Sequence, residues 1–324
     1  LWRRTTLAEY RKPQPQWETV LDLDALGKAE NENWVFKGVD CLRPDTPTAP
    51  YRYCLLSLSR GGADAVVVRE FDLVAKAFVK DGFVSPEAKQ DVDWKDADTL
   101  WIATDVGPGS MTTSGYARIA KEWKRGTPLS AARTVYEAQP TDVGVGISSE
   151  RESDTRRDWI TRSIAFWNSE QFVLVDGKPV KLEVPADATL LPFRDWLLVR
   201  LRTPWTVGGR THAGGVLLAI RFDAFMRGER QFDTLYAPTP RSALDSSPGN
   251  RIGVVRTRNA LLLTELDNVR PRLWEVRHDG TRWQRARVDL PDAGQIGNLS
   301  AYWASDSYFF TRQDFATPTT LYLR

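Results

Sequence analysis

One repeated pattern restricts the folding of this chain more than any other feature of the sequence. The pattern is a turn-forming Asp or Asn, one variable residue, and a short apolar run that ends in alternating polar residues. Four segments carry it, at 98–104, 195–201, 259–265 and 306–312. Short apolar runs bounded by Asp, Asn, Gly or Pro are typical of β-strands and turns. The pattern therefore predicts a chain built from repeated units of sheet.

The spacing of the repeats indicates how the sheets are organised. The first residues of the four segments, Asp98, Asp195, Asn259 and Asp306, are separated by 97, 64 and 47 residues. The first and last gaps fit two periods and one period of about 47 to 49 residues, which is in the range of β-propeller blades. The middle gap requires an insertion, and we expect the Gly-, Pro- and Ser-rich stretch 227–250 to supply it. About seven such units fit the chain, so the sequence predicts an all-β, seven-bladed β-propeller.

Weaker signals agree with an all-β chain. Further strands are predicted outside the four segments, at 74–79, 134–137, 215–220 and 272–276. Asp176-Gly177 and Asp279-Gly280 are typical of tight hairpin turns. Helical signals are short and are limited to 21–30 and 222–227. A doubly wound sheet would need a helix between successive strands, so that fold is not expected.

Composition restricts the partners and the compartment. The 44 basic and 42 acidic residues give a net charge of +2, without the sustained basic stripe expected of a nucleic-acid-binding protein. No apolar run reaches the length of a membrane span, so neither nucleic acid nor membrane is an expected partner. Cys41 and Cys54 lie on successive predicted strands, and we interpret them as neighbouring small apolar core residues. The cytoplasm is the expected compartment, and the periplasm stays open.

The sequence lacks the motifs of nucleophilic serine catalysis. An α/β-hydrolase needs G-x-S-x-G at a strand-to-helix turn. The stretch 146–150 lacks the second Gly, and 107–111 lacks both the spacing and a following helix. His212 and His278 stand in turn-like contexts and are predicted to be surface turn residues rather than catalytic bases. No catalytic residue is therefore assigned.

Carboxylates offer weak alternatives. Asp91, Asp93, Asp96 and Asp98 surround Trp94 and could form a calcium site, but Asx turns and solvent-facing strand positions explain them more simply. We therefore predict no metal and no cofactor. A glycosidase-like pair among the acidic residues of 150–154 is a further alternative, although nothing in the sequence fixes its separation.

Three stretches of the chain resemble a known family. The opening 1–10 followed by 17–23 looks like the first blade of the propeller in the prolyl oligopeptidase family of serine peptidases. Residues 195–199 followed by 205–209 resemble a mostly bacterial branch of that family, and 314–322 is similar to its last blade. The resemblance covers the whole chain but only the middle part of the family's full length.

The resemblance implies a lid without its enzyme. In the family, a seven-bladed propeller covers an α/β-hydrolase domain that carries a Ser-Asp-His triad. Residues 1–324 match the propeller alone, and Leu1 and Arg324 look like third strands of incomplete first and last blades. The expected partners are this hydrolase domain and short peptides, whose access the propeller would gate. The chain alone is expected to show no turnover.

The resemblance also indicates where peptide would bind. The highly charged loop 148–159 matches a family loop that faces the hydrolase domain and holds substrate partly through an Arg. Arg151 is the nearest candidate here, with Glu150 and Glu152 beside it. A solvated, salt-bridged loop is the alternative. The segment 89–94 lacks a Phe found in proline-cleaving members, which puts prolyl specificity in doubt.

Two predictions depend on the missing domain. A free-standing propeller that binds a protein or peptide partner is the alternative function, and it predicts that no hydrolase domain accompanies this chain. Incomplete terminal blades would leave strand edges exposed, and exposed edges favour pairing with a second copy. An edge-strand dimer is therefore a further expectation.

Overall fold

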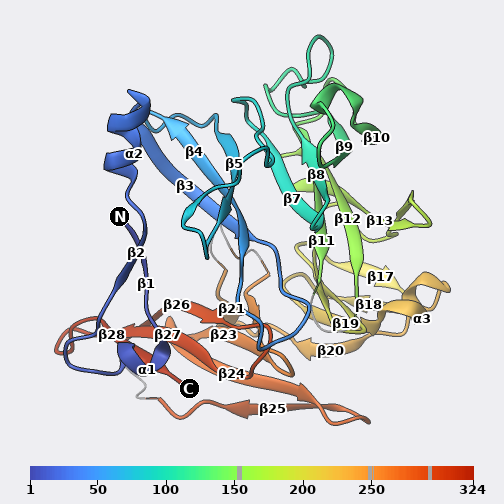
Figure 1. Ribbon diagram of the computed structural model, residues 1–324. Coiled ribbons are helices and arrows are strands. Elements are labelled where there is room, and N and C mark those ends of the chain that lie inside the picture. The colour runs from blue at the N-terminus through green and yellow to red at the C-terminus, as the bar shows by residue number, and fades with distance from the viewer. Residues whose placement is uncertain (152–154, 247–249, 251, 291–293) are drawn as a thin grey trace. The chain divides into compact units, whose positions relative to one another are not determined.

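The structure is a computed structural model that describes residues 1–324 except 152–154, 247–249, 251 and 291–293. Its contacts divide the chain into two compact units. The first comprises Leu1–Ser149 and Arg157–Leu182, and the second comprises Glu150–Arg156 and Glu183–Arg324. In both units the described strands form antiparallel sheets, so the chain is all-β as predicted (Figure 1).

The first unit contains three four-stranded sheets, each made of consecutive strands. The first sheet comprises β3 (Trp34–Cys41), β4 (Tyr53–Arg60), β5 (Val67–Asp72) and β6 (Ala77–Phe78). The second comprises β7 (Asp91–Asp96), β8 (Thr99–Ala103), β9 (Ile119–Lys124) and β10 (Arg133–Glu137). The third comprises β11 (Gly144–Glu150), β12 (Arg157–Ala165), β13 (Asn168–Val175) and β14 (Lys178–Lys181). A two-stranded ribbon of β1 (Trp2–Arg4) and β2 (Glu18–Leu21), the helices α1 (Leu7–Tyr10) and α2 (Leu23–Glu30), and a 3₁₀ turn at Leu129–Ala131 complete it.

The second unit contains three further sheets. One comprises β15 (Thr189–Phe193), β16 (Trp196–Arg200), β19 (Leu217–Arg221) and β20 (Asp233–Tyr236), with a separate hairpin of β17 (Trp205–Val207) and β18 (Arg210–His212) and the helix α3 (Phe222–Met226). The next comprises β21 (Ser242–Leu244), β22 (Val254–Arg256), β23 (Leu261–Asp267), β24 (Arg270–His278) and β25 (Trp283–Arg287). The last comprises β26 (Gln295–Ala301), β27 (Tyr308–Gln313) and β28 (Thr320–Leu323).

The blades of a β-propeller are recognisable in these sheets because the core lies between neighbouring sheets. In the first unit, Leu55 of β4 packs in one cluster with Leu100 of β8, and Trp101 of β8 packs in another with Ile160 of β12. A blade cannot bury both of its faces alone, and stacking on the next blade solves this. In the second unit, Leu262 of β23 shares a cluster with Tyr308 of β27 in the same way.

The predicted number of blades is wrong. The described residues form six sheets of blade size, of which five have four or more strands and the last has three. Where the first of seven blades was expected, β1 and β2 form only a two-stranded ribbon. A ribbon of two short strands has too little surface to act as a full blade, and it instead packs Val20 against the β3–β6 sheet.

The middle gap in the repeat has a different cause from the one predicted. Residues 227–250 were expected to hold an insertion, but they contribute β20 and β21 to blades. The extra length comes mainly from the β17–β18 hairpin, which is inserted between β16 and β19 of one sheet. The hairpin pairs only with itself among the described strands, so it adds residues without adding a blade.

Cys41 and Cys54 are neighbours as predicted, but they are bonded to each other. They face one another directly on β3 and β4 and form a disulfide across 13 residues of sequence. Cys54 is fully buried, so this bond lies at the edge of the core between the β1–β2 ribbon and the β3–β6 sheet. The interpretation as two unlinked core residues is therefore wrong.

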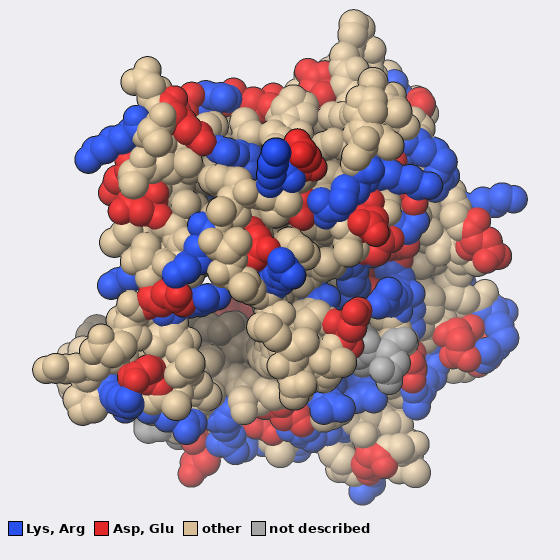
Figure 2. All heavy atoms as spheres, in the orientation of Figure 1, with Lys and Arg blue, Asp and Glu red and all other residues tan. Residues whose placement is uncertain are grey.

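Two surface features bear on partners. No helix among the described residues is long and apolar enough to span a membrane. Figure 2 shows Lys and Arg interspersed with Asp and Glu over the face that it presents.

In the last sheet β28 pairs with β27 and with no other described strand. Self-association through this edge stays a prediction, which sedimentation at high concentration would check.

Candidate functional site

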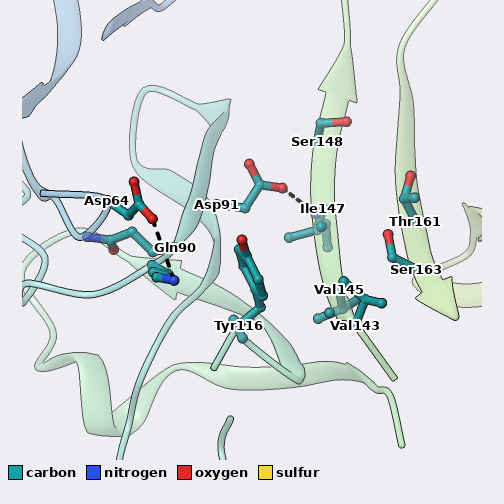
Figure 3. A pocket seen from close by; sticks show the side chains of 14 residues that line it. Asp64, Gln90, Asp91, Tyr116, Val143, Val145, Ile147, Ser148, Thr161 and Ser163 are labelled. Atoms are coloured by element: carbon teal, nitrogen blue, oxygen red, sulfur yellow. Dashed lines mark hydrogen bonds and ion pairs between the residues drawn. The ribbon is translucent and has the colours of Figure 1, made fainter. Parts of the chain in front are cut away.

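A cavity of about 450 Å³ opens in the first unit between β7 and β11. Its lining comes from Asp64 before β5, residues 89–91 at the start of β7, the loop before β9, most of β11 with the residue before it, and two residues of β12. Its volume is within the range of small-molecule and peptide sites. Asp91 lies in the middle of its lining (Figure 3).

The alternation of β7 places Asp91 and Asp93 on the same face of the strand, toward β11. Asp91 Oδ2 accepts the backbone N–H of Ile147 at 3.0 Å, and Asp93 Oδ2 accepts that of Ser149 at 2.7 Å. β7 and β11 are edge strands of neighbouring sheets, so carboxylates here take the place of ladder hydrogen bonds. These contacts join the two blades along one line.

Gly146 is what allows Asp91 to approach so closely. A Cβ at position 146 would lie 2.7 Å from Asp91 Oδ2, a separation shorter than real Cβ contacts. Any side chain there would push the carboxylate away from the Ile147 N–H. The glycine in the stretch 146–150 therefore has a packing reason, and Ser148 lies within strand β11 rather than at a nucleophile turn.

The surroundings of Asp91 favour its neutral form. The pKa of Asp91 is raised to about 6, mainly by burial among protein atoms; the Ile147 N–H opposes this rise and the charge of Asp40 adds to it. The side chain is nevertheless exposed to the cavity itself. Asp91 is thus a carboxyl group enclosed by protein and facing a small volume of solvent.

The rest of the lining is polar on two sides of Asp91. On one side Lys89 Nζ lies 3.7 Å from an oxygen of Asp64 and 5.0 Å from the centre of the Tyr116 ring. On the other side are hydroxyl groups from β11 and β12, at Ser148, Thr161 and Ser163, as Figure 3 shows. Val143, Val145 and Ile147 supply apolar wall between them.

This arrangement is suited to binding rather than to bond cleavage. The lining contains no His or Cys. Among the described residues no group of three or more His, Cys, Asp or Glu is placed to hold a metal ion. The two oxygens of Asp93 and Asp91 nearest β11 are instead used on backbone N–H groups.

The predicted peptide-binding residues lie elsewhere. Glu150 ends β11, is only 7% exposed, and has Oε1 3.9 Å from Arg256 Nη1 of the second unit. Arg151 follows it and is half-buried, and Glu152 lies outside the described residues. Neither Glu150 nor Arg151 lines the Asp91 cavity. Their role in substrate binding stays a prediction.

The histidines do not occupy the surface turns predicted for them. His212 lies in β18, is 6% exposed and packs against Phe232, and burial lowers its pKa. His278 ends β24, and its ring contacts those of Trp196 and Trp283. Both imidazoles pack against aromatic side chains. Phe232 and Trp196 are distant in sequence from the histidines that they contact, so the local sequence did not reveal these contacts.

Sequence reasoning noticed Asp91 but not its role. Its alternation with Asp93 was weighed as a calcium site, whereas both side chains cross to a strand some 56 residues away. The detectable signal was the pair of carboxylates on one strand face. The sequence did not reveal that the edge strand β11 lies beside β7, with Gly146 facing Asp91.

Comparison with known proteins agrees with this architecture. Residues 1–176 match the family model described as "Prolyl oligopeptidase, N-terminal beta-propeller domain". An uncharacterized peptidase of Sinorhizobium fredii is 34% identical over 99% of this chain and 44% of its own length. An uncharacterized peptidase of Rickettsia prowazekii is 27% identical over 100% of this chain and 46% of its own length.

A solved structure gives the same result. The structure of a post-proline cleaving enzyme from Rickettsia typhi matches with a TM-score of 0.89 at 26% identity, and covers 100% of this chain and 48% of that one. The chain therefore spans about half the length of the relatives it matches. More than half of its residues lie in the matched propeller model, and the chain belongs to the prolyl oligopeptidase family, as its N-terminal β-propeller domain.

Proposed function

We propose that this chain is the non-catalytic lid of a serine peptidase that acts on short peptides. Its partner is an α/β-hydrolase domain in the same protein, and its role is to restrict which peptides reach that domain. The observation that carries the proposal is the family match together with the lengths of the relatives. The peptidases that match this whole chain are about twice as long as the chain. A lid shapes access rather than chemistry.

The specificity belongs to the same proposal. Cleavage after proline is the specificity to test first, since the Rickettsia typhi relative is a post-proline cleaving enzyme. The absence of Phe from 89–94 predicts that any prolyl pocket here is lined differently.

A ladder of substrates tests the gating role. The full-length protein is incubated with proline-containing peptides of increasing length, and with a folded protein that displays the same sequence in a surface loop. Gating predicts rapid cleavage of the short peptides and no cleavage of the folded protein. An unrestricted protease, which should cut the same loop, is the control. Equal cleavage of the loop and the short peptides by the full-length protein would contradict the lid.

The isolated chain provides the second arm. Residues 1–324 should show no turnover of any member of the ladder, because the sequence holds no G-x-S-x-G motif. Turnover that a serine-directed inhibitor stops would contradict the assignment of catalysis to another domain.

The disulfide bears on the compartment. Disulfides persist in oxidising compartments and are rare in the cytosol. The Cys41–Cys54 bond therefore supports the periplasm, which the sequence left open, over the cytoplasm. Fractionation of the source cells with periplasmic and cytosolic marker enzymes would decide between them.

A further inference from the structure

We propose that the cavity between β7 and β11 binds a protonated amino or guanidino group of a peptide, with the carboxylate of Asp91 as its partner. The binding of the cation rests on the geometry of the cavity. The identification of its bearer as a peptide rests on the proposed function.

The carboxylate of Asp91 has one oxygen to offer. Oδ2 accepts the Ile147 N–H, and no hydrogen bond or ion pair to Oδ1 is found among the described residues. A carboxylate can accept several hydrogen bonds on each oxygen, and an ammonium or guanidinium group donates three to five. The raised pKa of Asp91 also indicates that its negative charge lacks a compensating partner within the protein.

No other charge of the lining neutralises Asp91. Lys89 is the one cation among the lining residues, and its ammonium contacts Asp64 and the face of the Tyr116 ring. One cation against two carboxylates leaves the lining with a net negative charge. A ligand cation restores the balance without displacing an existing contact.

The shape of the cavity also fits a cation on an apolar stem. Val143, Val145 and Ile147 line the wall of β11, against which methylene groups can pack. The hydroxyls of Ser148, Thr161 and Ser163 can accept the remaining donors of the ligand. Neutral acyl or alkyl groups would leave the carboxylate without a partner and would bind less well.

Three matched peptides without proline separate the sources of the cation. Acetyl-Ala-Lys-Ala-amide carries a side-chain ammonium, Ala-norleucine-Ala-amide carries an N-terminal ammonium, and acetyl-Ala-norleucine-Ala-amide is neutral. Their binding to the full-length protein is measured by calorimetry at pH 7.5. We expect one or both cationic peptides to bind about 10-fold more tightly than the neutral one, the gain expected of a charged hydrogen bond. Equal affinities of all three for the wild-type protein would overturn the proposal without any variant.

Two variants then assign the effect to Asp91. Asp91→Asn keeps an oxygen for the Ile147 N–H but removes the charge, and should reduce the preference for cationic peptides to less than about 2-fold. Asp93→Asn is the matched control, because Asp93 makes the equivalent bond to Ser149 on the same strand but does not line the cavity. Its preference should equal that of the wild type. A preference that survives Asp91→Asn in folded protein, or that both variants lose alike, would overturn the assignment.

Failure of this inference can be told from failure of the proposed function. Binding of the three peptides does not require hydrolysis. If the full-length protein cleaves no short peptide but retains Asp91-dependent preference for the cation, the lid proposal fails and the cation site stands. If it cleaves short peptides without such a preference, the lid proposal stands and the cation site fails.

Discussion

Asp91 shows how one residue can depend on another that is distant in sequence. Its carboxylate lies against β11 only because Gly146 has no side chain to meet it, and its neighbour Asp93 repeats the contact two residues later. A carboxylic acid in this position is held by one backbone N–H and enclosed by protein, so its ionised form is disfavoured. The residue is therefore costly to the fold at neutral pH, which is typical of groups kept for binding.

The raised pKa of Asp91 predicts an unusual dependence of stability on pH. The pKa is about 6 in the folded protein against 3.8 ordinarily, so the folded state binds more protons between these values and its stability increases as the pH falls through them. The charged or titratable groups near the carboxyl are Asp40, Asp64, Lys89 and Tyr116. We expect Asp91→Asn to be more stable than the wild type at pH 8 and equal to it near pH 4.

Urea denaturation at pH 4, 6 and 8 measures this difference. Its size at pH 8 should be of the order of 1 kcal/mol, because solvent in the cavity offsets part of the cost of burial. Asp93→Asn should not show the same gain. An Asp91→Asn variant less stable than the wild type at pH 8 would show that the ionised carboxylate has a partner in the folded protein.

At the scale of elements, the disulfide fixes the connection that departs most from the repeat. Most first and second strands of these blades are joined by short turns, but β3 and β4 are joined by 42–52, which contain three prolines. Cys41 and Cys54 close this loop at its base, where the two strands pair. The bond holds in register a pair of strands that no tight turn aligns.

Loss of the disulfide should destabilise the first unit. Closing a loop of this length stabilises a protein by about 2 to 4 kcal/mol, mainly by restricting the unfolded chain. We expect Cys41→Ser to lower the melting temperature as much as a reducing agent lowers that of the wild type, and the reducing agent to have no further effect on the variant. Alkylation of the urea-unfolded wild type without reductant should label neither cysteine, and labelling of both would show that the bond is absent.

At the scale of the whole molecule, the sequence predicted the blades where their turns were short. The four repeated segments correspond to β8, β16, β23 and β27, each the second strand of its sheet. β4 and β12 occupy the same place but do not begin with the repeated pattern, because a long loop precedes β4 and the charged stretch 151–156 precedes β12. The runs 215–220 and 272–276 are confirmed as the next strands, β19 and β24.

The site could be predicted only in part, for a related reason. Alternation along β7 places Asp91 and Asp93 on one face, and this is readable from the sequence. The stacking of separate blades decides which strand lies opposite β7, and it also places Gly146 against the carboxylate of Asp91. Local patterns carry no information on such contacts, and the same limit applies to the partners of Glu150 and His278.

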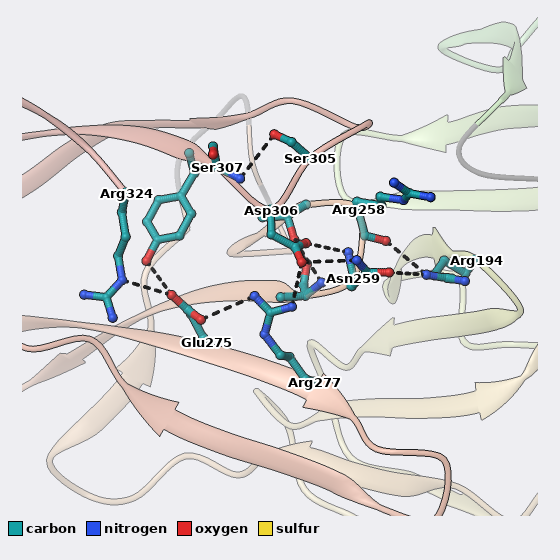
Figure 4. Close-up of polar contacts among 12 residues, drawn as sticks. Arg194, Arg258, Asn259, Glu275, Arg277, Ser305, Asp306, Ser307 and Arg324 are labelled. Atoms are coloured by element: carbon teal, nitrogen blue, oxygen red, sulfur yellow. Dashed lines mark hydrogen bonds and ion pairs between the residues drawn. The ribbon is translucent and has the colours of Figure 1, made fainter. Parts of the chain in front are cut away.

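In two of the four repeats, both in the second unit, the Asp or Asn that begins the repeat also joins neighbouring sheets, at Asn259 and Asp306. Asp306, in the turn before β27, accepts hydrogen bonds from Thr257 Oγ1 at 2.7 Å, from the backbone and side chain of Asn259 at 2.8 and 3.1 Å, and from Arg277 at 2.9 Å (Figure 4). Nearby, Tyr308 donates to Glu275 of β24 at 2.8 Å. These contacts link the β21–β25 sheet to the β26–β28 sheet.

Asp306→Ala should therefore destabilise the second unit far more than the equivalent change in another blade. Removing one carboxylate that satisfies four donors should lower the free energy of unfolding by about 2 to 4 kcal/mol. Asp195→Ala is the matched control. Asp195 begins the same pattern, but its side chain is 65% exposed and, among the described residues, pairs only with Arg221 at 3.5 Å, so its loss should cost less than about 0.5 kcal/mol. Equal effects of the two changes would show that the carboxylate of Asp306 is no more than a turn residue.

Acid titration provides an independent measure of the same contact. Burial tends to raise the pKa of Asp306, but the hydrogen bonds from Thr257, Arg277 and Asn259 outweigh this effect and hold the pKa well below its ordinary value. A lowered pKa means that the unfolded chain binds the proton more readily, so the stabilisation is complete above about pH 4 and is lost as the pH falls below it. The difference between wild type and Asp306→Ala in urea denaturation should thus be constant from pH 7 to 5 and smaller at pH 3. If the stability difference stays constant down to pH 3, the negative charge of Asp306 contributes little to it. The cost of the substitution would then come from hydrogen-bond donors left without a partner.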